Sequence, residues 1–130
     1  MPEPIAGKPD YYGGVAWLPS SVEKARRKIN KSGVVFDSFA VRGVSGIVFG
    51  AKLAHVMKKN LVVVRKPNES AHASGMVEGL KPYRYLFVDD FVASGYTQRT
   101  VMDEIQREYP AAQMVGRYLY HDGELTLEGV

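Results

Sequence analysis

Two adjacent carboxylates, Asp89 and Asp90, stand at the end of an apolar run in the segment YLFVDDFVASGYT, residues 85–97. A buried strand has no use for two charges, so a polar partner must meet them. The segment then turns to small and hydroxyl-bearing residues, with Ser94 and Gly95 at their centre. Backbone N–H groups at the start of a helix attract anions, and a glycine lets a phosphate approach the backbone closely. The spacing therefore predicts a phosphate cradle next to a pair of carboxylates.

The acid pair and the cradle together indicate the kind of ligand. Two carboxylates beside a phosphate site would repel the ligand unless they accept hydrogen bonds from its hydroxyl groups, as a sugar would allow. The segment therefore predicts a site for a ribose 5-phosphate. The alternative is a magnesium or phospho-acceptor site of the kind found in receiver domains. Receivers place their acids after the first strand, however, and that interpretation leaves the cradle unexplained.

The elements that must hold these residues alternate between strand and helix. Apolar β-branched runs predict strands, and apolar residues at helical spacing predict helices. In one domain this order favours an α/β fold, a mainly parallel sheet flanked by helices, whose ligands bind at the carboxyl ends of the strands. The expected strands are residues 34–41, 61–65, 84–88 and 113–120, and the expected helices are residues 20–30, 47–59 and 97–109.

Local signals add detail to this outline. Ser20 and Glu23 form a capping-box pattern at the start of the first helix. Residues 67–81 have no periodicity, and their Asn, Ser, Ala and Gly content predicts a mobile loop. The segment HDGE, residues 121–124, predicts a turn into a C-terminal hairpin. The second helix is expected to turn six apolar residues inward, namely Ile47, Val48, Ala51, Leu53, Ala54 and Met57.

Three polar features fall at the carboxyl ends of predicted strands: Arg42–Gly43, Arg65–Lys66 and residues 89–97. A parallel sheet brings these strand ends to one edge, so the three features should meet in one site. Two of them have a simpler interpretation when taken alone. Arg42 fits a solvated loop arginine, and Arg65–Lys66 fits a charge pair that protects a strand edge from aggregation. Their convergence is what favours a binding site.

The composition fits one ordinary globular domain. The chain has 130 residues, 45% of them apolar and 24% charged, and it has no cysteine, which excludes disulfides and thiolate metal sites. It has no apolar run as long as a membrane span and no signal-peptide pattern, so a cytoplasmic protein is expected. A net charge of +3 suits a phosphate ligand but gives little support to nucleic-acid binding, which is not expected.

The segment VDDFVASGYT resembles the phosphoribosyl-pyrophosphate (PRPP) signature of the type I phosphoribosyltransferases. The defining positions of that signature are filled by Asp89, Asp90, Ser94, Gly95 and Thr97. The segment FAVRGVSGIVFGAKLA resembles the family's pyrophosphate loop with the helix that follows it. The segment VVVRKPN resembles the strand and lid start of the adenine and xanthine members. Together these likenesses cover about residues 34–120.

The resemblance implies an enzyme that displaces pyrophosphate from PRPP with a nitrogenous base and forms a nucleoside 5-monophosphate, in nucleobase salvage or related metabolism. It implies that residues 68–79 close as a lid, that magnesium arrives with PRPP without direct protein ligands, and that the chain forms a homodimer. The implied catalytic residues are Asp89, Asp90, Arg42 and Lys66. The implied contacts of the ribose 5-phosphate are Asp89, Asp90, Ala93, Ser94, Gly95, Tyr96 and Thr97, and those of pyrophosphate are Arg42, Gly43, Arg65 and Lys66.

The sequence departs from the family pattern in the lid. No Lys or Arg lies between Pro67 and Gly79, where orotate members have a basic lid residue. A neighbouring subunit could supply the missing cation. The departure also keeps a second interpretation open, in which the protein is a non-catalytic sensor of PRPP or nucleotides on the same fold.

The sequence also leaves little material for the hood that reads the base in this family. A single domain of residues 1–130 with its core at residues 34–120 leaves the arm and helix of residues 1–33, the hairpin of residues 121–130, or both. The arm carries aromatic residues that fit a core or an interface as well as a base-stacking platform, namely Tyr11, Tyr12 and Trp17. The acceptor base is not predicted.

Overall fold

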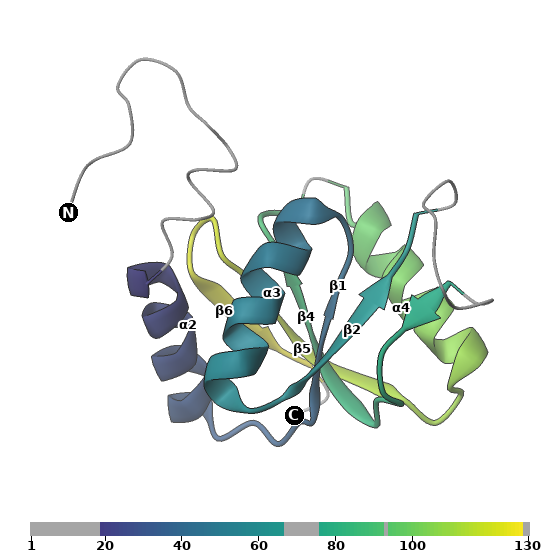
Figure 1. The fold of residues 1–130 in the computed structure, drawn as a ribbon, viewed down its shortest axis with the longest axis horizontal. Coiled ribbons are helices and arrows are strands. Elements are labelled where there is room, and N and C mark those ends of the chain that lie inside the picture. Colours follow the sequence, from purple (N-terminus) through teal and green to yellow (C-terminus); the bar gives the residue numbers. More distant parts are fainter. Residues whose placement is uncertain (1–18, 67–75, 93, 129–130) are drawn as a thin grey trace, which may run out of the picture.

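The computed structural model describes residues 19–66, 76–92 and 94–128 of the 130-residue chain. Strands and helices alternate along it as the sequence predicts (Figure 1). The helices are α2 (Pro19–Ser32), α3 (Val44–Met57) and α4 (Tyr96–Glu108). The strands are β1 (Ser38–Val41), β2 (Asn60–Val64), β3 (Val77–Glu78), β4 (Arg84–Asp89), β5 (Gln113–Leu119) and β6 (Glu124–Leu127).

The strands form one six-stranded sheet in the order β3-β2-β1-β4-β5-β6. The central strands β2, β1, β4 and β5 run parallel to one another, and the edge strands β3 and β6 pair antiparallel with their neighbours. This is the predicted α/β sheet flanked by helices. Because β1 and β4 are parallel neighbours, the residues that follow them, Arg42 and Asp90, lie at the same edge of the sheet.

Helices cover both faces of the sheet, and β4 divides its side chains between two cores. Leu86 and Val88 pack with α2 and α3, whereas Tyr85 and Phe87 pack with α4. All four side chains are at most 2% exposed. A strand buried on both faces reads as a continuous apolar run, and it gives Asp89 a rigid base.

Helix α3 packs closely on β1, which fixes its first turn at the edge of the sheet. A Cβ at Gly50 would lie 2.5 Å from Cγ1 of Val41, so this approach requires a glycine. Phe49 turns into the core and stacks on Tyr120, with ring centroids 4.4 Å apart. The prediction that Ala51 is one of the inward-facing residues of this helix is wrong, because Ala51 is exposed.

The strand predictions differ from the structure in two places. β1 begins at Ser38 rather than Val34, because the carbonyl of Val35 accepts a hydrogen bond from Nε of Arg84 at 2.8 Å instead of pairing with the backbone of a neighbouring strand. The predicted loop of residues 67–81 contains β3, which pairs with β2. A two-residue strand is too short to produce a period in the sequence.

The predicted capping box of α2 is also wrong. The helix begins at Pro19, a residue suited to the first helical position, and Ser20 already lies inside it. The carboxylate of Glu23 does not turn back to the helix start. It accepts hydrogen bonds from the guanidinium groups of Arg26 and Arg27 instead.

The predicted C-terminal hairpin is present, since β6 returns antiparallel along β5 after a turn at residues 120–123. β6 extends the sheet and α2 covers one of its faces, so both belong to the core. The predicted hood falls otherwise on residues 1–18, which lie outside the described residues. None of the described helices is long and apolar enough to span a membrane.

Candidate functional site

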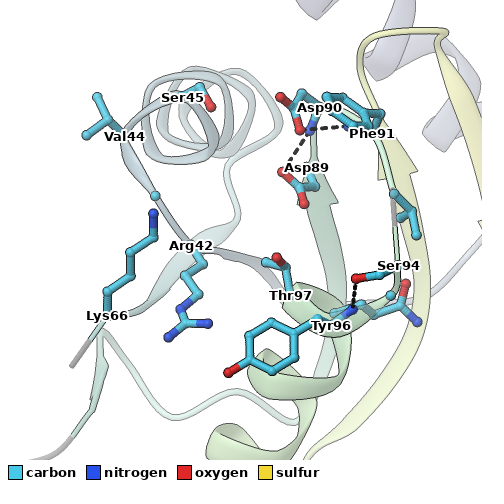
Figure 2. Close-up of a pocket in the computed structure, with 14 residues that line it drawn as sticks. Arg42, Val44, Ser45, Lys66, Asp89, Asp90, Phe91, Ser94, Tyr96 and Thr97 are labelled. Atoms are coloured by element: carbon cyan, nitrogen blue, oxygen red, sulfur yellow. Dashed lines mark hydrogen bonds between the residues drawn. The ribbon is translucent and has the colours of Figure 1, made fainter.

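A cavity of about 510 Å³ lies beyond the carboxyl ends of β1 and β4 (Figure 2). The three polar features predicted to meet do meet there, because the cavity is lined from the β1–α3 junction, from the end of β2 and from the β4–α4 connection. The lining residues are Arg42, Gly43, Val44, Ser45, Lys66, Asp89, Asp90, Phe91, Val92, Ser94, Gly95, Tyr96, Thr97 and Gln98. Ala93, predicted to bind the phosphate, lies outside the described residues.

The acid pair is held by backbone hydrogen bonds at the end of β4. Oδ1 of Asp89 accepts the N–H of Asp90 at 2.9 Å, and Oδ1 of Asp90 accepts the N–H of Phe91 at 2.7 Å. The backbone carbonyls of both acids accept N–H groups from Tyr120 and His121, each at 2.9 Å. These hydrogen bonds fix the backbone of the acid pair at the cavity, next to the turn that follows β5.

Asp89 has a strongly raised pKa. Burial raises the pKa of Asp89 to about 6, and the neighbouring carboxyl of Asp90 adds to the rise. The N–H of Asp90 and the positive charge of Lys66 oppose it. A carboxyl with such a pKa is ionised at neutral pH, and a cationic or hydroxyl-bearing ligand would stabilise that form further.

The predicted phosphate cradle is the start of α4. Gly95 caps the helix with φ 80° and ψ 0°, a conformation that favours glycine, and its carbonyl accepts the N–H of Arg99 at 3.0 Å. Oγ of Ser94 accepts the N–H of Tyr96 at 3.3 Å. Beyond its chain neighbours and its own helix, a Cβ at Gly95 would meet no atom of the described residues within 4 Å, so these residues leave the space above the backbone open. First-turn N–H groups such as that of Thr97 have no acceptor within the helix and suit an anion.

Positive charge gathers at the start of α3, opposite this cradle. The helix begins at Val44 and not at Ile47 as predicted, so the segment after Gly43 is a helical turn rather than a loop. Gly43 has φ 86°, and a Cβ on it would lie 3.9 Å from Nζ of Lys66. Nε of Arg42 is buried and has no hydrogen-bond partner in the part of the chain that the structure describes. Two cations and a helix N-terminus therefore face the same space.

The structure separates Arg65 from Lys66, although the sequence predicts pyrophosphate contacts for both. Nε of Arg65 lies 3.4 Å from Oε2 of Glu78 on β3, and the side chain is only 11% exposed. Successive residues of an extended chain point to opposite sides, so Lys66 lines the cavity and Arg65 does not. This placement leaves the predicted pyrophosphate contact of Arg65 without structural support.

Five lining residues were not predicted as ligand contacts, and two of them, Phe91 and Gln98, have side chains that suit a role in the site. Phe91 is 53% exposed and stands edge-on to the ring of His121, with centroids 6.2 Å apart. A large aromatic residue directly after the acid pair is a signal that the sequence does carry. Oε1 of Gln98 accepts a hydrogen bond from Nη1 of Arg117 at 2.9 Å. The signal for this pair is an arginine inside an otherwise apolar strand.

No protein-family model and no curated protein matches the sequence. Solved structures match the fold. An orotate phosphoribosyltransferase from Francisella tularensis aligns with a TM-score of 0.63 and 18% identity, over 80% of this chain and 51% of its own. An adenine phosphoribosyltransferase from Thermoanaerobacter pseudethanolicus aligns with a TM-score of 0.56 and 20% identity, over 81% of this chain and 70% of its own.

A UMP synthase from Leishmania donovani aligns with a TM-score of 0.58 and 19% identity, over 81% of this chain. The chain spans only 23% of that protein and about half of the Francisella protein. At these identities the likeness establishes the fold. The chain has the α/β fold of the type I phosphoribosyltransferases, as its sequence motifs predict.

Proposed function

We propose that this protein is a phosphoribosyltransferase, which displaces pyrophosphate from PRPP with a nitrogenous base and forms a nucleoside 5-monophosphate. One observation carries the proposal. The acid pair of Asp89 and Asp90 lines one cavity together with a helix N-terminus and the cations Arg42 and Lys66. PRPP carries the matching groups, because it has ribose hydroxyls, a 5-phosphate and a pyrophosphate. The fold and the motif VDDFVASGYT support the same activity.

The charges of the cavity suit the reaction. The bond from C1 of the ribose to the pyrophosphate oxygen breaks, and a bond from C1 to the nitrogen of the base forms. The electron pair leaves with the pyrophosphate, so negative charge grows beside Arg42 and Lys66 while the ribose becomes positive beside Asp89. Charges fixed in advance in this way lower the barrier, and losing one typically costs on the order of 100- to 1000-fold in rate.

The aromatic ring of Phe91 marks the side from which the base would enter. In Figure 2, Arg42 and Lys66 lie to one side of Asp89, and Phe91 lies toward the other. An in-line displacement at C1 requires the incoming nitrogen and the leaving oxygen to lie on opposite sides. The exposed faces of Phe91 and His121 suit a planar heterocycle, which aromatic rings hold by offset or edge-on stacking.

Magnesium is part of the proposal as a companion of PRPP. Among residues 19–66, 76–92 and 94–128, no group of three or more His, Asp or Glu side chains converges to hold a metal ion. The ligands of the cation would be substrate oxygens and water, with no direct protein ligand, and the carboxylates of Asp89 and Asp90 would lie near it. When bound, magnesium would neutralise charge on the departing pyrophosphate.

A homodimer, a cytoplasmic location and a role in nucleobase salvage complete the proposal. The expected lid falls mainly on residues 67–75, outside the described residues. That segment has no Lys or Arg, and a cation from a second subunit would compensate for this.

Calorimetric titration with PRPP and magnesium, followed by a pyrophosphate-release assay over a panel of purines and pyrimidines, tests the proposal. We expect PRPP to bind and one base to release pyrophosphate. Folded protein that does not bind PRPP would contradict both the activity and the ligand. A second function, PRPP sensing, is favoured by the missing lid cation, and it predicts binding without release for every base.

A further inference from the structure

The modest net charge of the protein conceals a segregated charge distribution. Helix α2 holds five of the seventeen Lys and Arg residues and only one of the fourteen Asp and Glu residues. Twelve cations and thirteen acids remain in the rest of the chain, a net charge of −1. The net positive charge of the protein therefore comes from this one helix.

Four of these cations form a single exposed row, which we call the α2 stripe: Lys24, Arg27, Lys28 and Lys31. Their spacing of three, four and seven residues places them on one face of the helix. The apolar residues of α2 lie on the opposite face and are buried in the core. A shallow hollow of about 410 Å³ runs along the stripe, and among the described residues its lining comes from α2 alone.

The α2 stripe has little counter-charge. Arg27 pairs with Glu23, with Nε 3.1 Å from Oε1, but that carboxylate is shared with Arg26. Within the described residues, no carboxylate forms an ion pair with Lys24, Lys28 or Lys31. Lys28 donates to the backbone carbonyl of Gly123 in the β5–β6 turn.

The stripe is a cost to the folded state. Like charges three or four residues apart on a helix repel one another and destabilise it. The stripe contains four such pairs. The core uses only the opposite face of α2, and none of the stripe residues lines the proposed PRPP cavity. Apart from the bond of Lys28 to Gly123, neither the packing of the core nor the PRPP site accounts for the row of cations.

The chemistry of the stripe selects among anionic partners. A helix that binds a membrane surface needs apolar side chains beside its cations, and those of α2 are buried. A protein interface needs an apolar or aromatic centre, which the stripe does not have. Nucleic-acid interfaces are polar, strongly cationic and formed largely by phosphate contacts. The stripe is about 10 Å long, a length over which a duplex presents about six phosphates.

We propose that the α2 stripe binds the phosphate backbone of a nucleic acid, at a surface separate from the PRPP cavity. Each stripe cation that neutralises a phosphate releases counterions, so binding must weaken steeply with salt. For four contacts on a duplex, the slope of log K against log salt is expected near −3.6. Affinity should then fall about 150-fold between 50 and 200 mM salt.

Fluorescence anisotropy of the full chain with a 20-base-pair duplex, as DNA and as RNA, and with one single strand, measures this. The test variant is Lys24→Gln/Lys28→Gln/Lys31→Gln. The matched control is Lys52→Gln/Lys81→Gln/Arg107→Gln, which changes exposed cations elsewhere. Both variants have a formal net charge of 0, since each removes three positive charges from +3. Circular dichroism and thermal unfolding establish that all proteins are folded.

We expect the test variant to lose at least tenfold in affinity and to show a slope near −1, while the control keeps most of its affinity. The variant Lys24→Arg/Lys28→Arg/Lys31→Arg should bind as well as the parent, which separates charge from folding. Equal losses in the test and control variants would assign binding to net charge and overturn the proposal. Absence of binding at 50 mM salt would overturn it too, as would equal or tighter binding to phosphatidylserine vesicles or to polyglutamate.

Discussion

Arg117 on β5 holds Gln98 in the first turn of α4, with Nη1 2.9 Å from Oε1, while its own Nε is buried without a hydrogen-bond partner in the described residues. A partly buried cation thus lies behind the helix start that is proposed to bind the 5-phosphate. We expect Arg117→Met to raise the Kd for PRPP about tenfold, since charge-assisted contacts contribute about 1.5–3 kcal/mol and this charge acts indirectly. Calorimetry measures the change.

The control for this prediction is Gln98→Ala, which keeps the cation but removes its partner. A role of Arg117 in positioning alone predicts the same loss in both single variants and in the double variant. A direct electrostatic role predicts a larger loss in Arg117→Met. An unchanged Kd for PRPP in both single variants and in the double variant would show that Arg117 and Gln98 play no part in PRPP binding.

The acid pair should be needed for turnover and dispensable for folding. In the variant Asp89→Asn/Asp90→Asn, the side-chain amide oxygens can still accept the backbone N–H groups of residues 90 and 91. The negative charge beside the ribose is lost. We expect pyrophosphate release to fall at least 100-fold with the thermal midpoint preserved. Asp122→Asn, an exposed acid in the β5–β6 turn, is the matched control and should leave the rate unchanged.

The pH dependence follows from the pKa of Asp89, about 6 in the folded protein against about 4 for an ordinary aspartate. Between these values the folded state binds more protons than the unfolded state. The free energy of unfolding should therefore fall as pH rises from 4 to 6, and Asp89→Asn should lose this dependence. PRPP affinity should change in the opposite direction, because the ionised carboxylate accepts the ribose hydroxyls. Identical stability profiles in the two proteins would contradict the assignment.

Gly95→Ala should fold and still fail to hold the 5-phosphate. The positive φ of Gly95 strains an alanine by about 1 kcal/mol, and its methyl group enters the open space above the helix start. Gly33 offers a matched control, since it also has a positive φ, of 72°, and open space for a Cβ, but lies far from the cavity lining. Gly33→Ala should lose similar stability and keep its PRPP affinity. Equal PRPP affinities in the Gly95→Ala and Gly33→Ala variants would show that the start of α4 does not bind the 5-phosphate.

Phe91→Ala should impair the base and spare PRPP. Removing an exposed stacking ring costs about 1–1.5 kcal/mol of base binding, which corresponds to a five- to tenfold rise in KM for the base. Phe91→Tyr keeps the ring and should restore the KM. A rise in the Kd for PRPP with no change in the KM for the base would show that the ring of Phe91 contacts PRPP instead of the base.

The parts of this site that the sequence predicts are those in which local spacing determines the geometry. Residues 89–97 contain a strand end and a helix start within a few positions, so the acids and the cradle can be predicted together. The position of Arg65 outside the cavity lining goes with its ion pair to Glu78 on β3, a contact that no local sequence pattern encodes. A prediction from periodicity treats position 117 as part of a buried strand, although that residue reaches Gln98, nineteen positions away.

The start of α3 shows a similar limit. Val44, Ser45 and Gly46 resemble a loop because valine and glycine are weak helix formers. They are helical because α3 packs closely against β1 at Gly50, where any side chain would collide with Val41. Tertiary packing overrides propensity here, and it places first-turn N–H groups beside the cations of the cavity.

The β5–β6 turn forms hydrogen bonds with two separate parts of the protein. Lys28 of α2 donates to the carbonyl of Gly123, and two residues earlier the N–H of His121 donates to the carbonyl of Asp90. One short segment therefore connects the helix that is proposed to bind a polyanion with an acid that is proposed to orient the ribose. Any free energy transmitted through this segment is reciprocal by thermodynamic necessity. Occupying α2 would change the affinity for PRPP by the same factor by which PRPP changes the affinity of α2 for its partner.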